Sequence, residues 1–209
     1  MHPDQTSLAA LIGSRICHDL INPIGAISNG LELVAMSTPA PNSPEMTLIQ
    51  QSCDNATARI RFLRIAFGSA GDHRPVSTAE AATTLKQHYD GTRITPEWRC
   101  ETDLPRSAVQ LAYLVVLCVE VALPQGGAIV VSNDVSGIKV TAMGPSIAQT
   151  PALWGLLENT SGATKTDLRP AHVQFGLLAA LCRELGLMPR FEFDDKKAEV
   201  VVSLPSKIV

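Results

Sequence analysis

The residue types and spacing best suited to chemistry lie in one stretch, Arg15–Pro23, which reads Arg-Ile-Cys-His-Asp-Leu-Ile-Asn-Pro. An unperturbed imidazole has a pKa of about 6.5 and is mostly neutral near pH 7. One ring nitrogen of His18 can therefore act as a nucleophile. Asp19 can accept a hydrogen bond from the other ring nitrogen or stabilise the cation formed on reaction. Asn22, one helical turn further on, can contact a transferred group. For Asp19 and Asn22 the alternative is ordinary polarity of a helix surface.

The apolar residues around the histidine recur with the period of an α-helix. They lie at spacings of three and four and comprise Ile16, Leu20, Ile24, Ile27, Leu31 and Val34. This pattern predicts one buried face of a long helix. At about 100° per residue, His18 lies roughly 200° from Ile16 and points away from that face. Residues three, four and seven apart share a side of a helix, so we expect a docking face around the histidine, formed by Asn22, Gly25 and Asn29 and flanked by Arg15, Ile21 and Ala26.

Two long helices are predicted at the start of the chain. The first begins near Thr6 and Ser7, ends before Ser37, and bends at Pro23, where the hydrogen bond to the carbonyl of Asp19 is lost. The second opens with Ser43 as its cap and Pro44 as its first residue. Its apolar positions alternate three and four apart until Gly68, at Met46, Ile49, Cys53, Ala56, Ile60, Leu63 and Phe67.

Two antiparallel helices with one apolar face each cannot enclose a core alone, so we expect a four-helix bundle made from two copies of the chain. If the hairpin turns near Ala40, His18 lies level with a group of arginines on the second helix, Arg59, Arg61 and Arg64. Arginine can steady a phosphoryl group or bind an acidic partner surface. The alternative is that these side chains are solvated or pair with carboxylates on the bundle.

Composition excludes several classes of function. The chain has 209 residues, 45% of them hydrophobic, and a net charge of −3. The hydrophobic content predicts a folded protein with a hydrophobic core. The negative net charge does not indicate a nucleic-acid-binding protein, which would need an excess of positive charge. No uninterrupted apolar run is long enough to span a bilayer, and the first residues lack the pattern of a signal peptide. Five cysteines without metal-ligand spacing argue against a zinc site and a disulfide framework. We expect a cytoplasmic protein that binds neither membranes nor nucleic acid.

The domain organisation follows from the glycine, proline and helix-capping residues that separate the periodic segments. We predict a helical hairpin over residues 1–68, a linker over 69–78 that contains Gly71 and Pro75, and a second domain over 79–209. In the second domain the pattern predicts helices near 79–90, 105–122 and 170–185, and strands near 92–101, 128–133, 137–143, 190–193 and 199–204. The fold class is therefore α plus α+β, with one mixed sheet and helices on one face.

The order His-Asp-x-x-Asn-Pro resembles the phospho-acceptor box of sensor histidine kinases, and the element order of the second domain resembles their Bergerat-type ATP-binding domain. The turn Pro124–Gly127 is kept, but the nucleotide-binding positions of that family are replaced. Its metal-holding Asn falls near Cys118, Ala142 stands where an Asp binds adenine, and Ser146 and Gln174 stand at glycine positions. Side chains obstruct the approach of phosphates to backbone amides. We expect no ATP binding.

A phospho-acceptor hairpin on such a degenerate domain resembles the ChpT-type histidine phosphotransferases of alphaproteobacteria, also in Asn29–Leu33 and Arg64–Gly68. The resemblance implies a homodimer, phosphorylation at His18 and no cofactor bound by this chain. It implies phosphate relay from the receiver domain of a hybrid histidine kinase to response-regulator receivers of the CtrA type. The receivers are expected to carry the Mg²⁺.

Several alternatives stay open at this point. A receiver phosphatase is one, because phosphatase-active kinases can use an Asn at the offset of Asn22. A residual ATP-dependent histidine kinase would need the nucleotide positions that are replaced here, and a non-catalytic scaffold predicts that His18 is dispensable. A hydrolase built on Cys17 and His18 is disfavoured, since the two side chains leave the helix in different directions.

Overall fold

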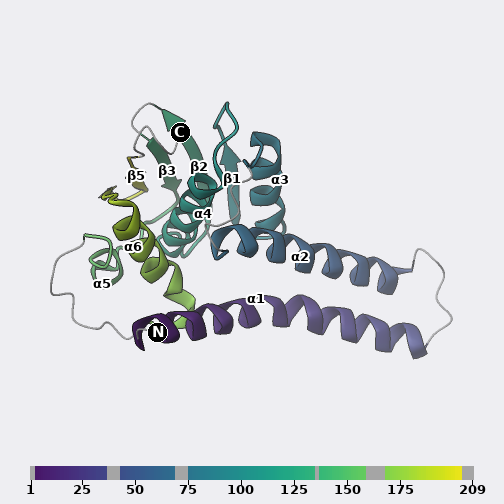
Figure 1. The fold of residues 1–209 in the computed structure, drawn as a ribbon. Coiled ribbons are helices and arrows are strands. Elements are labelled where there is room, and N and C mark those ends of the chain that lie inside the picture. Colours follow the sequence, from purple (N-terminus) through teal and green to yellow (C-terminus); the bar gives the residue numbers. More distant parts are fainter. Residues whose placement is uncertain (1–2, 37–42, 69–74, 135–136, 159–167, 204–209) are drawn as a thin grey trace.

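A helical hairpin lies along one side of an α/β domain in the computed structural model (Figure 1). The structure describes residues 3–36, 43–68, 75–134, 137–158 and 168–203. The predicted turn near Ala40 and most of the predicted linker lie outside these residues. The hairpin and the mixed sheet confirm the predicted fold class.

The two hairpin helices are α1 (Pro3–Met36) and α2 (Pro44–Ala66). Helix α2 starts as predicted, because the Ser43 side chain accepts a hydrogen bond from the backbone N–H of Met46 at 3.4 Å and Pro44 needs no such partner. Helix α1 starts earlier than predicted and runs through Pro23 as one helix. Pro23 itself is buried, so packing against the neighbouring structure offsets the hydrogen bond that its ring removes.

The second domain contains a five-stranded sheet in the order β1-β2-β3-β5-β4. Strands β1 and β2 are parallel and the other neighbours are antiparallel, as a mixed sheet requires. The strands are β1 (Ile94–Trp98), β2 (Gly127–Asp134), β3 (Gly137–Met143), β4 (Pro189–Phe193) and β5 (Lys197–Val202). The helices are α3 (Thr78–His88), α4 (Arg106–Val121), α5 (Pro151–Trp154) and α6 (Val173–Leu185), with a 3₁₀ turn, η1 (Pro170–His172), before α6. Helix α5 was not predicted, since four residues carry no periodic signal.

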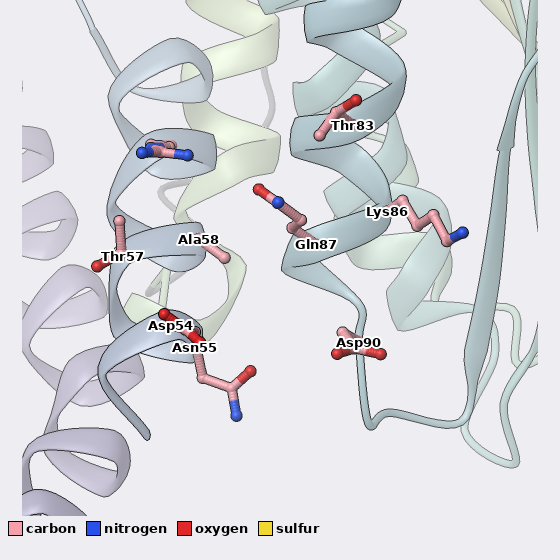
Figure 2. A pocket seen from close by; sticks show the side chains of 9 residues that line it. Asp54, Asn55, Thr57, Ala58, Thr83, Lys86, Gln87 and Asp90 are labelled. Carbon is pink, nitrogen blue, oxygen red and sulfur yellow. The ribbon is translucent and has the colours of Figure 1, made fainter. Parts of the chain in front are cut away.

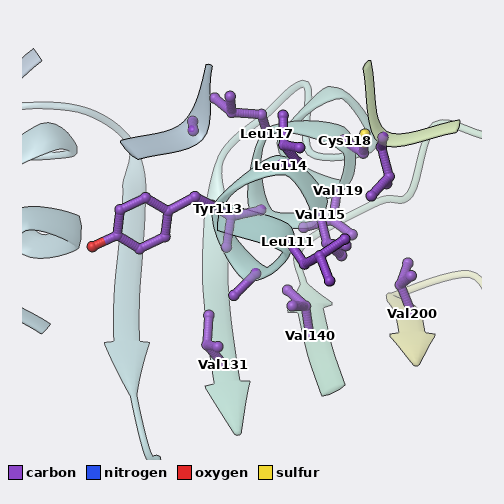
Figure 3. Packing of buried hydrophobic residues seen from close by; sticks show 14 of the residues in the cluster. Leu111, Tyr113, Leu114, Val115, Leu117, Cys118, Val119, Val131, Val140 and Val200 are labelled. Carbon is purple, nitrogen blue, oxygen red and sulfur yellow. The ribbon is translucent and has the colours of Figure 1, made fainter. Parts of the chain in front are cut away.

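The core is centred on α4, which is apolar on all sides and almost wholly buried. Its side chains lie over Val131, Val140 and Val200 of three neighbouring strands (Figure 3). Each such buried side chain contributes about 1.5–3 kcal/mol relative to exposure. The last turns of α2 belong to this same core, because Phe62 and Leu63 are buried within it. The hairpin is thereby fixed to the second domain at the end of α2.

The apolar face predicted for α1 is only partly buried in the single chain. Ile16, Leu20, Ile27 and Val34 are half-buried, but Ile24 and Leu31 are each 54% exposed. On α2, Ile60 is 51% exposed and Met46 is also exposed, although both belong to the predicted apolar face. Their burial in the expected four-helix bundle stays a prediction, and in the single chain these positions are exposed. The reason is geometric, since one neighbouring helix covers only part of the circumference of another.

Candidate functional site

His18 stands out from the middle of α1 with 80% of its side chain exposed. Its Nδ1 atom lies 3.2 Å from Oδ1 of Asp19, whose side chain is only 9% exposed. A carboxylate accepts hydrogen bonds and cannot donate them, so this contact favours the tautomer with the proton on Nδ1. The lone pair of Nε2 is then directed away from Asp19. The outward orientation predicted for His18 is confirmed, and the ring is prepared for nucleophilic attack through Nε2.

The Asp19 carboxylate is held from within the chain. Nε of Arg15 donates to Oδ2 of Asp19 at 2.8 Å, and Nη1 of the same guanidinium donates to the backbone carbonyl of Ala171 at 2.7 Å. Sequence reasoning assigned Arg15 to a partner surface, whereas the structure turns its side chain inward. The spacing of four between Arg15 and Asp19 is the available sequence signal for this pair.

The backbone of Asp19 is also contacted. Pro23 has no N–H to donate to the carbonyl of Asp19, and Nη1 of Arg59 in α2 donates to that carbonyl at 3.5 Å. Arg59 therefore lies level with the His18 region, as the hairpin arithmetic predicted. The contact also gives a physical reason why α1 tolerates a proline beside the histidine.

The predicted docking face is open. Ile21, Asn22, Gly25 and Asn29 are exposed, and a Cβ atom at Gly25 would meet no atom within 4 Å. Ala26 is half-buried at the edge of this face. The structure thus brings these residues together around His18, while their contacts with a partner stay a prediction.

Arg61 and Arg64 are exposed on α2. Arg61 lines a cleft of about 700 Å³ between α2 and α3, together with Lys86 and Asp90. Figure 2 shows Asp54, Asn55 and Thr57 on one side of this cleft and Thr83, Gln87 and Lys86 on the other. Neither His18 nor Asp19 lines the cleft, which carries both acidic and basic groups.

A buried polar cluster between the hairpin and the second domain was missed by sequence reasoning. The His88 ring stacks on Phe62 with ring centroids 3.9 Å apart, and burial, followed by the charge of Arg59, lowers the pKa of His88 to about 3. The Tyr89 hydroxyl donates to Oε2 of Glu120 at 2.8 Å, and burial raises the pKa of the Glu120 carboxyl. Only the tertiary fold brings these groups together, so no local sequence pattern predicts the cluster.

The second domain matches the family model described as histidine phosphotransferase C-terminal domain over residues 78–197. The chain is also 34% identical over 187 residues to the protein phosphotransferase ChpT of Brucella abortus, covering 86% of this chain and 87% of that protein. This chain belongs to the ChpT-type histidine phosphotransferases.

Solved structures agree with membership of the ChpT-type family. A structure described as a bacterial phosphotransferase superposes on this one with a TM-score of 0.77 and 29% identity, covering 95% of this chain and 96% of the other. A weaker likeness extends to the Acinetobacter baumannii histidine kinase AdeS, with a TM-score of 0.47 and 14% identity over 90% of this chain and 96% of that one. The second domain of this phosphotransferase is a mixed α/β sandwich.

In this ChpT-type chain, three of the four positions expected to replace nucleotide-binding residues are buried, and the fourth, Ser146, is half-buried. Cys118 and Ala142 have no exposed surface, and Gln174 is 1% exposed. Nε2 of Gln174 donates to the carbonyl of Leu117 at 3.2 Å. Trp154 packs near these positions on an aromatic group, with its ring centroid 5.1 Å from that of Phe175. Among these residues, Gln174 stands at an expected glycine position, and its side chain fills this part of the core.

Metal sites and membrane spans are two further kinds of feature that the described segments could contain. Among those residues, no group of three or more His, Cys, Asp or Glu side chains is arranged to hold a metal ion. In the same part of this phosphotransferase, no helix is both long and apolar enough to cross a membrane.

Proposed function

We propose that this histidine phosphotransferase relays phosphoryl groups between receiver domains by way of a phosphohistidine at His18. The observation that carries the proposal is an exposed imidazole whose Nδ1 contacts a buried carboxylate, in a member of the ChpT-type family. The proposed donor is the receiver of a hybrid histidine kinase, and the proposed acceptors are response-regulator receivers of the CtrA type.

The chemistry needs little from this chain. Nε2 of His18 attacks the phosphorus of an aspartyl phosphate, the new bond is P–Nε2, and the bond to the aspartyl oxygen breaks and returns that oxygen as carboxylate. As the ring becomes cationic, Asp19 stabilises it through the hydrogen bond from Nδ1. The second transfer is the reverse of the first, onto another receiver aspartate. The receivers supply the Mg²⁺, so this chain provides orientation and the nucleophile.

The proposed working form is a homodimer. Ile24 and Leu31 on α1 lie seven residues apart. Met46, Cys53 and Ile60 on α2 follow one another at intervals of seven, so each set forms one row. At about 100° per residue, both rows lie roughly a quarter turn from the line of contact between α1 and α2. The antiparallel packing turns both rows to the same side of the hairpin. A second copy placed there would complete a four-helix bundle and leave His18 uncovered.

We further propose that the chain does not use ATP. The support is the packing of Cys118, Ala142 and Gln174 into the core, because adenine and phosphate recognition needs a carboxylate, an amide and open glycine loops at these positions. An unpaired adenine amino group alone would cost about 1–3 kcal/mol.

The test uses purified parent and His18→Gln protein mixed with a receiver phosphorylated on its aspartate with labelled phosphate. The parent should take up the label and pass it to a second receiver, and His18→Gln should take up none. Because His18 is exposed, the variant should unfold at the same temperature as the parent. Label on the variant would remove His18 from the reaction.

The same proteins distinguish the competing functions. With labelled ATP and Mg²⁺, the parent should stay unlabelled, and calorimetry at millimolar ATP should show no saturable heat. A dissociation constant in the micromolar range would instead support an ATP-dependent histidine kinase.

The specific observation for a receiver phosphatase is the exposed Asn22 one turn after His18. Release of inorganic phosphate without a phosphohistidine, lost in Asn22→Ala and kept in His18→Gln, would establish that function instead.

A further inference from the structure

One arginine connects the histidine-bearing helix to the second domain. The Arg15 guanidinium donates through Nε to Oδ2 of Asp19 at 2.8 Å and through Nη1 to the carbonyl of Ala171 at 2.7 Å. Ala171 belongs to η1, which leads directly into α6. The two hydrogen bonds use different nitrogens of one planar group, so together they fix its plane.

The anchor for this arginine is joined directly to the core of the second domain. Helix α6 follows η1 at once, and its residues Gln174 and Phe175 are buried in the core. Figure 1 shows the start of α6 lying over the N-terminal half of α1. The Ala171 carbonyl is therefore held by the second domain, and a bond from Arg15 to this oxygen transmits that position to α1.

The restraint passes from Arg15 to the imidazole through one carboxylate. Oδ2 of Asp19 is engaged by Arg15, which leaves Oδ1 facing Nδ1 of His18 at 3.2 Å. The His18 side chain is 80% exposed, so few other contacts define its rotamer or tautomer. A fixed carboxylate is the device by which proteins set the tautomer of a histidine.

We propose that Arg15 is a positioning residue through which the second domain orients Asp19 and, through Asp19, holds His18 as the Nδ1–H tautomer with Nε2 free to accept a phosphoryl group. The inference rests on the proposed function of His18. It assigns the second domain a part in phosphotransfer that requires no nucleotide, namely holding the acceptor ring in its reactive form.

The first test reads the tautomer directly, without activity. Long-range ¹H–¹⁵N NMR of the full chain near neutral pH should show the Nδ1–H form of His18 as the major tautomer in the parent. In Arg15→Gln the population should shift towards the Nε2–H form. Arg183→Gln is the matched control, because Nε of Arg183 also donates to a backbone carbonyl, that of Ala179 in α6, without a contact to Asp19. An unchanged tautomer in folded Arg15→Gln would overturn the proposal.

Arg15→Lys separates charge from geometry. Lysine keeps the positive charge but has one compact ammonium group instead of a planar fork. It should therefore recover little of the parent tautomer ratio. Full recovery would mean that charge near Asp19 is sufficient and that the link to Ala171 has no such role, which overturns the inference. If Arg15→Gln does not fold, Asp19→Ala tests the same path. It removes the carboxylate that contacts Nδ1, so the His18 population should also shift towards the Nε2–H form.

The second test measures transfer from a phosphorylated receiver. Arg15→Gln should slow transfer on the order of tenfold, the effect of losing an outer partner that orients a histidine. In the Asp19→Ala background the same change should slow transfer no further, because Arg15 acts through Asp19. Additive losses would contradict the proposal. Failure of the parent to accept phosphate would instead refute the proposed function. The tautomer measurement would still test the positioning role of Arg15, because it does not depend on activity.

Discussion

His18 and Asp19 show how neighbouring residues on a helix meet opposite demands. A phosphoryl acceptor, the role proposed for His18, must be reachable by another protein, and the His18 side chain is 80% exposed. The group that orients it must be fixed, and the Asp19 side chain is 9% exposed and bound by Arg15. Because successive side chains leave a helix about 100° apart, one can face solvent while the next enters the interior. The Asp19 side chain then reaches back to the imidazole.

His88 offers a prediction at this scale. Burial, then Arg59, lowers the pKa of His88 to about 3, with opposing charge from Asp19 and a further lowering contribution from Arg15. The folded protein therefore keeps His88 neutral where the unfolded chain, with a histidine pKa of about 6.5, binds a proton. The free energy of unfolding should fall as the pH drops below about 6.5, by up to about 1.4 kcal/mol per pH unit.

Denaturant titrations of the parent and His88→Phe check this expectation. The variant lacks the titrating group, so its loss of stability between about pH 7 and about pH 5 should be smaller than that of the parent. Parallel stability curves for the two proteins would show that His88 does not contribute. The comparison uses slopes, so a lower stability of the variant at every pH does not obscure it.

At the scale of elements, α1 has three different sides. One side packs on α2, and Gly30 permits the close approach because a Cβ there would collide with the Ile49 side chain. A second side carries the exposed row of Ile24 and Leu31. The third carries His18 and the predicted docking face. The helix can serve three neighbours because its side chains are distributed around the whole circumference.

Gly25→Leu tests the docking side. A leucine there enters open space, so the fold should be kept and the helix stabilised by up to about 1 kcal/mol. The new side chain would hold a receiver away from His18, and transfer rates should fall. Gly30→Leu is the contrasting variant, with overpacking against Ile49 and a loss of about 1–3 kcal/mol in denaturant titrations. Transfer at the parent rate by Gly25→Leu would refute the proposed docking surface.

At the scale of the whole molecule, the hairpin and the second domain are joined by packing as well as by the chain. The end of α2 inserts Phe62 into the core, where its ring also stacks on Tyr113 with centroids 4.4 Å apart. The other side of the hairpin, with Ile24, Leu31 and Ile60, is left open to solvent. An apolar row of this kind is the side from which the proposed second copy would approach.

The double variant Ile24→Glu, Ile60→Glu should convert a dimer to a monomer, because it places charges on both rows of the interface. Sedimentation equilibrium measures the change, and circular dichroism checks that the helices persist. Met188→Glu is the control, since Met188 is an exposed apolar residue outside the hairpin. A parent that sediments as a monomer at all concentrations would refute the homodimer.

The sequence by itself determined most of the elements and the outward direction of His18. Helical periodicity predicted α1 and the outward side of His18, and the pair Ser43 and Pro44 predicted the start of α2. These features depend on residues within a few positions of one another, so the order of side chains is sufficient to predict them. The assignment of Cys118, Ala142 and Gln174 to degenerate nucleotide-binding positions rests on their order in the chain and stays a prediction.

Only the tertiary structure decided which neighbours the side chains meet. Arg15 turns inward because the carbonyl of Ala171, 156 residues away, comes to lie beside it. Ile24 stays exposed in the single chain although its spacing marks it as a buried position. Periodicity gives the direction in which a side chain leaves its helix, but the element that covers that direction is set by the packing of distant segments.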